Sequence, residues 1–180
     1  MGHPRSIART LALILITMAL TASYAQTSSP IAVTTLDTDR IRGTWYEIAR
    51  YPYKKEKHCV SDARELIAPD YKPTQLLLVD ACLTKAGDTE ARNLTAVANK
   101  RSTGGDFRVR TFWPFWRKYW ILALSPDYSW TMLGSPDHKT LWIFSKSPTL
   151  APDILAAIEA KAAAQGFPSN RLMMTPQIHP

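Results

Sequence analysis

Apolar and polar residues alternate over short stretches along most of the chain, as in strands that bury one face. The clearest stretch is residues 43–50 (GTWYEIAR), where β-branched and aromatic residues alternate and Trp45 would point inward. Gly43 suits a position where a large ring or another backbone comes close. The same pattern predicts eight strands, at residues 43–53, 60–71, 74–85, 92–100, 107–112, 118–125, 130–134 and 141–145. Eight short strands at this spacing, most followed by turn residues, predict an antiparallel barrel or sandwich.

One helix and a last short strand are predicted after these strands. Pro152 suits the first turn of the helix and Gly166 suits its end. An apolar stripe along the helix is formed by Ile154, Leu155, Ile158 and Ala162. Residues 171–175 form the final predicted strand, and the helix is expected to lie outside the barrel.

The first 25 residues have the pattern of a secretory signal. Arg5 and Arg9 precede an apolar run at residues 11–20, which is too short to span a bilayer comfortably. Small residues at positions 23 and 25 predict cleavage after Ala25, and this segment has no cysteine to accept a lipid. We therefore expect a periplasmic or secreted, non-lipidated protein with a flexible arm at residues 26–36 and one domain at residues 37–180.

Charge and motifs exclude several classes of function. The formal net charge is +7, and removal of Arg5 and Arg9 leaves +5, without a basic block long enough to predict nucleic-acid binding. The histidines after the signal, at positions 58, 138 and 179, do not have the spacing of metal ligands. No Ser-His-Asp order or glycine-rich phosphate loop is visible. The sequence therefore predicts neither a metal nor another cofactor.

The order of these elements, with Gly43-x-Trp45 on the first strand, resembles the lipocalin family. Residues 43–50, the turn at 125–128 (SPDY) and residues 141–150 (LWIFSKSPTL) are similar to its bacterial branch, and the likeness covers about residues 36–177. It implies an all-β fold: an eight-stranded antiparallel up-and-down barrel with a C-terminal helix packed outside. It also implies binding and carriage or storage of a small hydrophobic ligand, for the bacterial branch a fatty acid or lysophospholipid.

The resemblance further implies a closed barrel floor at Gly43 and Trp45. Lys146 stands where the family commonly has an arginine laid across the tryptophan. Lysine can still make the cation–π contact, but it lacks the planar fork of arginine. We expect weaker closure and unchanged function.

The ligand-binding residues are predicted from strand alternation together with the resemblance. The residues expected to line the lumen are Glu47, Ala49, Tyr51, Arg64, Leu66, Leu78, Val109, Thr111, Ile121, Ala123, Met132, Trp142 and Phe144. Small residues beside large rings favour a cavity, whereas the alternative is a barrel packed solid. Asp62, Arg64 and Asp80 would face inward by the same parity. They could bind a ligand head group, or they could satisfy one another, or a slip of one residue could turn them outward.

Aromatic residues are densest at residues 112–120 (FWPFWRKYW), around Pro114. Trp113 and Trp116 beside cationic residues suit a membrane interface, and the alternative is a packed loop between two strands. Cys59 and Cys82 are the only cysteines, in a chain expected to reach an oxidising compartment. The resemblance supports a disulfide between them, and a reactive thiol is the alternative.

Two rival functions come from other classes of protein. A lipid-modifying, isomerase-type lipocalin enzyme would need a positioned acid, base or free thiol in the cup. A haem or tetrapyrrole carrier would place a histidine inside the barrel, for which His138 is the candidate. The favoured prediction is a binding protein without catalysis.

Overall fold

The computed structural model describes residues 29–99 and 104–180, so the predicted signal peptide lies outside the described residues. Eight antiparallel strands form a closed barrel, which confirms the predicted fold. The strands are β1 (Gly43–Arg50), β2 (Cys59–Pro69), β3 (Gln75–Thr84), β4 (Thr89–Ala98), β5 (Asp106–Phe112), β6 (Phe115–Leu124), β7 (Trp130–Gly134) and β8 (Leu141–Ser145). Each strand pairs with the next, and β1 closes the barrel by pairing with both β8 and β2.

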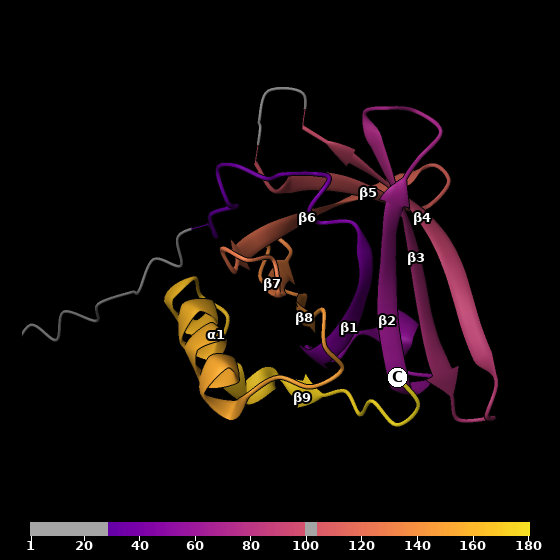
Figure 1. Ribbon diagram of the computed structural model, residues 1–180, viewed down its shortest axis with the longest axis vertical. Coiled ribbons are helices and arrows are strands. Elements are labelled where there is room, and N and C mark those ends of the chain that lie inside the picture. The colour runs from indigo at the N-terminus through magenta and orange to yellow at the C-terminus, as the bar shows by residue number, and fades with distance from the viewer. Residues whose placement is uncertain (1–28, 100–103) are drawn as a thin grey trace, which may run out of the picture.

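The remaining elements cover the outside and one rim of the barrel. They are η1 (Lys54–Glu56), α1 (Pro152–Ala164), η2 (Ser169–Arg171) and the short strand β9 (Met173–Met174), which pairs with β1. Figure 1 shows α1 beside the barrel wall, with β9 and the C-terminal segment following it. Within residues 29–99 and 104–180, no helix has the length and apolar character needed to span a membrane.

The helix α1 begins and ends where the sequence indicates. Pro152 is its first residue, and Gly166 just beyond its end has a φ of +82°. The N–H groups of Gly166 and Phe167 donate to carbonyls in the last turn, which is the usual way a helix ends at glycine. Ile158 and Ala162 are buried against the barrel, whereas Ile154 of the predicted stripe is exposed.

The two ends of the barrel differ. At one end, residues 33–41 fold across the strands, and Val33, Leu36 and Ile41 pack against the interior residues. The antiparallel register places the end of β1 with the start of β2, the β3–β4 turn, the β5–β6 turn and the β7–β8 turn at the opposite end. We call these the closed end and the open end.

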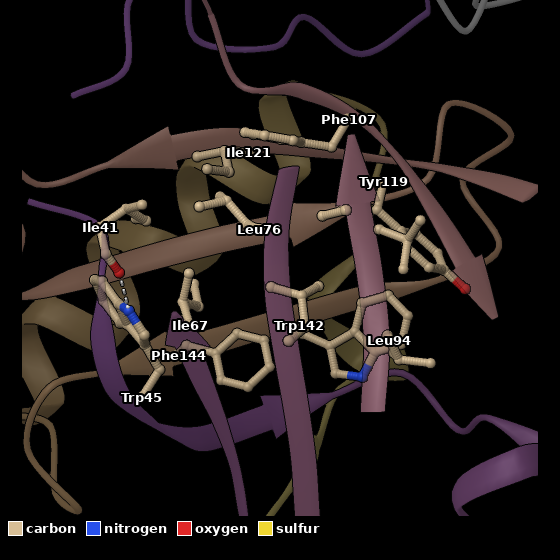
Figure 2. Packing of buried hydrophobic residues seen from close by; sticks show 13 residues of the cluster. Ile41, Trp45, Ile67, Leu76, Leu94, Phe107, Tyr119, Ile121, Trp142 and Phe144 are labelled. Carbon is tan, nitrogen blue, oxygen red and sulfur yellow. Dashed lines mark hydrogen bonds between the residues drawn. The ribbon is translucent and has the colours of Figure 1, made fainter. Parts of the chain in front are cut away.

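Buried apolar residues form two cores, one inside the barrel and one outside it. The inner core, drawn in Figure 2, consists of Ile41, Trp45, Ile67, Leu76, Leu78, Leu94, Ala96, Phe107, Val109, Tyr119, Ile121, Trp142 and Phe144. The outer core, under α1, consists of Ile48, Ala49, Tyr51, Leu122, Met132, Leu141, Ile143, Ile158, Ala162 and Phe167.

This division corrects part of the predicted lumen. The register shifts between Glu47 and Ala49 in β1, so the alternation changes phase there and Ala49 joins the outer core with Tyr51. A second shift in β6, between Ile121 and Ala123, likewise turns Ala123 toward the outer core. The predicted inward placement of Ala49, Tyr51 and Ala123 is therefore wrong.

Two further predicted positions are wrong for a simpler reason, a phase error of one residue. Met132 lies opposite Ile143, and directly opposite residues share a face, so Met132 belongs to the outer core. Leu66 is 43% exposed and lies between two inward-facing neighbours, Glu65 and Ile67. Its side chain therefore faces away from the lumen.

Candidate ligand-binding site

The barrel interior contains two adjoining cavities, which share Glu65, Leu78, Val109, Tyr119 and Leu133 in their walls. The larger, of about 80 Å³, lies toward the open end, and the smaller, of about 40 Å³, lies toward the closed end. We call them the upper and lower compartments. Each is large enough for several water-sized groups.

The lower compartment has an almost wholly apolar wall. Strands β2, β3, β4, β5 and β6 each direct at least one inner-core residue into it, and residues 36 and 41 cover its end. Its wall includes Ile67, Leu76, Ala96, Phe107 and Ile121. An aliphatic chain bound here would be removed from water and would lie against apolar side chains.

Trp45 lies at the closed end with Lys146 over its ring, the arrangement that the sequence predicts. Trp45 is 1% exposed, and its indole N–H donates to the carbonyl oxygen of Ile41 at 2.7 Å (Figure 2). The Nζ of Lys146 lies 4.1 Å from the ring centre and donates to the carbonyl oxygen of Arg42. Gly43 has a φ of +100°, and a Cβ added there would lie 3.2 Å from the Lys146 Nζ. Glycine therefore suits both the backbone conformation and the space at this position.

The upper compartment contains a network of charged side chains. Arg50 bonds to Glu47 and lies 3.7 Å from Glu56, measured from Nε to Oε2. Arg92 bonds to Glu56 at 2.9 Å and to Asp80 at 2.8 Å. Glu56 thus lies between two guanidinium groups, although it comes from η1 at the open end and its partners come from β1 and β4.

Burial raises the pKa values of several carboxyl groups in this network. Desolvation raises the pKa of Glu47 to about 7, against the opposing attraction of Arg50. It also raises the pKa of Glu56. The pKa of Glu65 lies well above its ordinary value because this carboxyl group is enclosed and next to Asp80. The cavity therefore holds carboxyl groups that keep their protons more readily than exposed ones.

Three aromatic rings stand beside these charges. Trp142 is nearly perpendicular to Tyr53 and to Tyr119, with ring centres 5.8 and 5.3 Å apart respectively. The indole N–H of Trp142 donates to Glu56 at 3.2 Å. Burial and a hydrogen bond with Tyr53 raise the pKa of Tyr119, so its hydroxyl stays protonated.

The wall also presents polar atoms that have no hydrogen-bond partner within the described residues. They are the hydroxyl oxygen of Thr111 and the Nε of Arg50. An unpaired buried polar atom is costly, and a ligand or water can satisfy it.

The structure separates the predicted Asp62–Arg64–Asp80 group. Asp80 lies opposite Glu65 and faces the upper compartment, as predicted. Arg64 borders that compartment, but it lies opposite Tyr46 and next to the inward-facing Glu65, so its side chain has the outward phase of Leu66. The predicted inward placement of Arg64 is therefore wrong. Its guanidinium donates to the carbonyl of Asp62 at 3.5 Å, and Arg92 makes the ion pairs instead.

Asp62 serves the C-terminal segment. It has a φ of +54°, and it accepts hydrogen bonds from the N–H groups of Ile178 and His179 at 2.5 and 2.9 Å. Although burial opposes the change, these bonds lower the pKa of Asp62. Asp62 therefore faces the C-terminal segment and not the lumen, as the alternative of an outward slip allowed, because the register shifts between Ser61 and Arg64.

Cys59 and Cys82 form a disulfide with a Cα–Cα distance of 5.6 Å, which confirms the predicted bridge. Register shifts in β2 between Cys59 and Ser61, and between Ser61 and Arg64, bring Cys59 back toward β3. No cysteine among the described residues is free. His58 lies close to both sulfurs, but bridged sulfurs are not thiolate ligands for a metal.

Several wall residues were missed by the sequence prediction, chiefly Glu56, Glu65 and Arg92. Arg92 precedes Leu94 and Ala96 in the same alternation, which is a signal that could have identified it. Glu56 carries no such signal, since it lies in a short helical turn outside the strands. His138 lies outside the lumen, where its ring stacks near Phe167 and its Nε2 is 3.0 Å from the carbonyl oxygen of Gln165. It is therefore not placed to bind a haem inside the barrel.

A Lipocalin-like domain model matches residues 36–177, almost the whole described barrel. The protein belongs to the lipocalin family. Outer membrane lipoprotein Blc of Citrobacter freundii is 27% identical to this lipocalin over 150 residues, which cover 81% of each chain. Temperature-induced lipocalin-1 of Arabidopsis thaliana is 26% identical over 150 residues, covering 79% of this chain and 80% of the plant protein. The predicted likeness to the bacterial branch is thus confirmed.

Solved lipocalin structures share the fold. Insecticyanin from the tobacco hornworm Manduca sexta has a TM-score of 0.65 at 17% identity, covering 84% of this chain and 85% of its own. The allergen Per a 4 from cockroaches also has a TM-score of 0.65, at 16% identity, covering 85% of this chain and 97% of its own. At such identities the likeness concerns the fold alone.

Proposed function

We propose that this lipocalin binds a single-chain lipid, a fatty acid or a lysophospholipid, in the barrel lumen and carries it without chemical change. The observation that supports this most is the division of the lumen. An apolar lower compartment suits an aliphatic chain, and a polar upper compartment at the open end suits its head group. Lipocalins bind small hydrophobic molecules, and the proposal specifies the ligand within that class.

The predicted site residues that line the two compartments keep this proposed role. They are Glu47, Leu78, Val109, Thr111, Ile121, Trp142 and Phe144. The network of Glu56, Glu65 and Arg92 joins them. The proposed location is the periplasm or the extracellular space, supported by the predicted signal and by relatives named outer membrane lipoproteins.

The test is titration of the delipidated protein with fatty acids and lysophospholipids of increasing chain length, followed by tryptophan fluorescence. Each methylene removed from water contributes about 0.8 kcal/mol, so affinity should rise with chain length until the lumen is full. Ala96→Trp, which fills the lower compartment, should abolish this rise. Asn93→Trp, on the same strand but exposed on the outer face, is the matched control and should bind normally.

Affinity that does not depend on chain length, or normal binding by Ala96→Trp, would place the ligand outside the lower compartment and contradict the proposal. Mass spectrometry of the ligand recovered after incubation tests for turnover. An altered lipid would support the enzyme alternative.

We also propose that the open end contacts a lipid bilayer through the β5–β6 turn. Trp113 at its tip is 82% exposed, and Phe112 and Phe115 beside it are 53% and 57% exposed. Cationic groups surround these rings: Lys55 lies 4.6 Å from the centre of the Phe112 ring, and Arg110 lies 5.6 Å from that of Trp116. Exposed aromatic rings with adjoining cations suit an anionic membrane surface. Such a contact would place the open end of the lumen against the source of the lipid.

A further inference from the structure

The upper compartment contains more charged groups than are needed to bind an aliphatic chain or a single carboxylate. Its charged lining residues are the acids Glu47, Glu56, Glu65, Asp80 and Glu90 and the cations Arg50, Lys55 and Arg92, with Arg64 at its border. Arg50 and Arg92 are already paired with Glu47, Glu56 and Asp80. The acidic groups therefore outnumber the cations that the protein supplies to them.

Among the described residues, Glu65 is the acid of this compartment that forms no ion pair. Its facing charged groups are Asp80 on β3, Arg92 on β4 and Glu56 on η1, and its hydrogen-bond partner is Asp80, another carboxyl group. Arg92 is bonded to Glu56 and Asp80. A carboxyl group enclosed in this way holds its proton more readily than an exposed one, and a further cation beside it would favour the ionised form.

Aromatic rings adjoin the same carboxyl groups. The ring of Trp142 is nearly perpendicular to that of Tyr53 and to that of Tyr119, and the indole N–H of Trp142 also donates to Glu56. Figure 2 shows Tyr119 and Trp142 next to each other on the inner face of the barrel. Perpendicular aromatic rings together with carboxylates form the kind of site that binds alkylammonium groups.

A second, independent observation indicates a polar ligand rather than a self-contained network. Arg50 is only 4% exposed, yet its Nε has no hydrogen-bond partner within the described residues, and the same holds for the buried hydroxyl oxygen of Thr111. Both residues line the upper compartment. The wall thus offers a donor for an anionic oxygen a short way from acids suited to a cation.

We propose that the upper compartment binds the ammonium group of a zwitterionic single-chain lipid of the choline or ethanolamine type. The ammonium group lies among Glu56, Glu65 and the three rings, and a phosphate oxygen of the same head group can accept from the Nε of Arg50. This inference rests on the proposed function, and it selects lysophospholipids with a cationic end over free fatty acids.

Proton release accompanies this binding. An ammonium group beside Glu65 favours its ionised form, as it does for Glu47, whose facing groups are Arg50, Glu56 and the hydroxyl of Thr175. Both acids hold their protons more tightly than exposed acids when no ligand ammonium group is bound. Binding of the zwitterionic lipid therefore releases protons into the buffer.

The experiment compares lysophosphatidylcholine with lysophosphatidylglycerol of the same acyl chain, both below their micellar concentrations. The two share the chain and the phosphodiester, and only the first has an ammonium group. We expect the choline lipid to bind about tenfold more tightly, since a desolvated cation–π contact alone contributes at least that much. The basic net charge of the protein would favour the anionic glycerol lipid, so it cannot produce this preference.

Glu65→Gln keeps the shape and a hydrogen bond but cannot ionise. It should reduce the preference to about twofold or less, whereas Glu159→Gln on α1 should preserve the tenfold preference. Calorimetry of the unmodified protein in buffers of different ionisation enthalpy measures proton release without any variant.

Equal affinity for the two lipids, or binding of the choline lipid without proton release, would overturn the ammonium site while leaving lipid binding intact. Failure of both lipids and of fatty acids to bind would instead overturn the proposed function. A preference for the choline lipid that survives Glu65→Gln would also overturn the assignment to this compartment.

Discussion

The ammonium group of Lys146 lies 4.1 Å from the centre of the Trp45 ring and bonds to the carbonyl oxygen of Arg42. The indole N–H of Trp45 bonds to the carbonyl oxygen of Ile41. Both acceptors belong to the segment just before β1, so the pair holds that segment across the closed end. Lysine therefore performs the contact that the family commonly assigns to arginine, without the planar fork.

Removing Trp45 should strongly destabilise the barrel. Because the side chain is 1% exposed, we expect Trp45→Ala to lower the free energy of unfolding by about 3–5 kcal/mol in urea denaturation. Lys146→Met, which keeps the aliphatic stem, should lower it by about 1–2 kcal/mol, and Lys146→Arg should cost less. A loss below about 1 kcal/mol for Trp45→Ala would contradict the closure described above.

The disulfide should be formed in the mature protein and should stabilise it. Mass measurement after alkylation without reductant should detect no labelled cysteine. The bridge joins residues 23 apart, so replacing Cys59 and Cys82 together by alanine should lower the free energy of unfolding by about 3 kcal/mol. Equal free energies of unfolding for the unmodified protein and the double alanine variant would show that the bridge does not stabilise the fold.

Stability should fall as the pH rises from about 4.5 to about 7. The pKa of Glu47 is raised from 4.5 to about 7, so over this range the native state holds a proton that the unfolded chain has lost. The free energy of unfolding then decreases by about 3 kcal/mol from this group alone. Glu56 and Glu65 act in the same direction, since burial raises the pKa of each.

Asp62 contributes the opposite dependence in a different pH range. Its pKa is lowered, so its stabilising bonds are lost only as the pH falls through and below 3.8. Urea denaturation at pH 5 and pH 7.5 measures the effect of Glu47 alone of these two residues, because both pH values lie above the range in which Asp62 titrates. Glu47→Gln should show a fall smaller by about 2 kcal/mol between these values. A variant with the unmodified slope would contradict the assignment to Glu47.

Binding to membranes should depend on the aromatic turn and on salt. Trp113→Ala combined with Trp116→Ala should weaken binding to phosphatidylglycerol vesicles about tenfold or more, measured by sedimentation. Tyr71→Ala is the matched control, because Tyr71 is 88% exposed but lies in the β2–β3 turn at the closed end. Added salt should weaken binding by screening Lys55 and Arg110. Equal losses in both variants would remove the β5–β6 turn as the contact.

The strands, the late helix and the inward phase of Trp45 could be predicted from the sequence alone. Strand alternation and a proline–glycine pair around a helix are local signals, so residues 43–50 and Pro152–Ala164 can be assigned without knowledge of their neighbours. Trp45 lies before the register shift in β1, so its inward phase was correct.

Which of the later side chains face the lumen depends on strand pairing that forms only in the folded barrel. The shifts after Glu47 and Ile121 arise where β1 meets β8 and β6 meets β7, and an added residue there reverses the alternation of everything beyond it. The acid network has the same origin, because barrel closure alone brings Glu56 from η1 between arginines of β1 and β4. Contacts between segments far apart in sequence produce both the register shifts and the acid network, and the alternation of residues within one strand does not indicate such contacts.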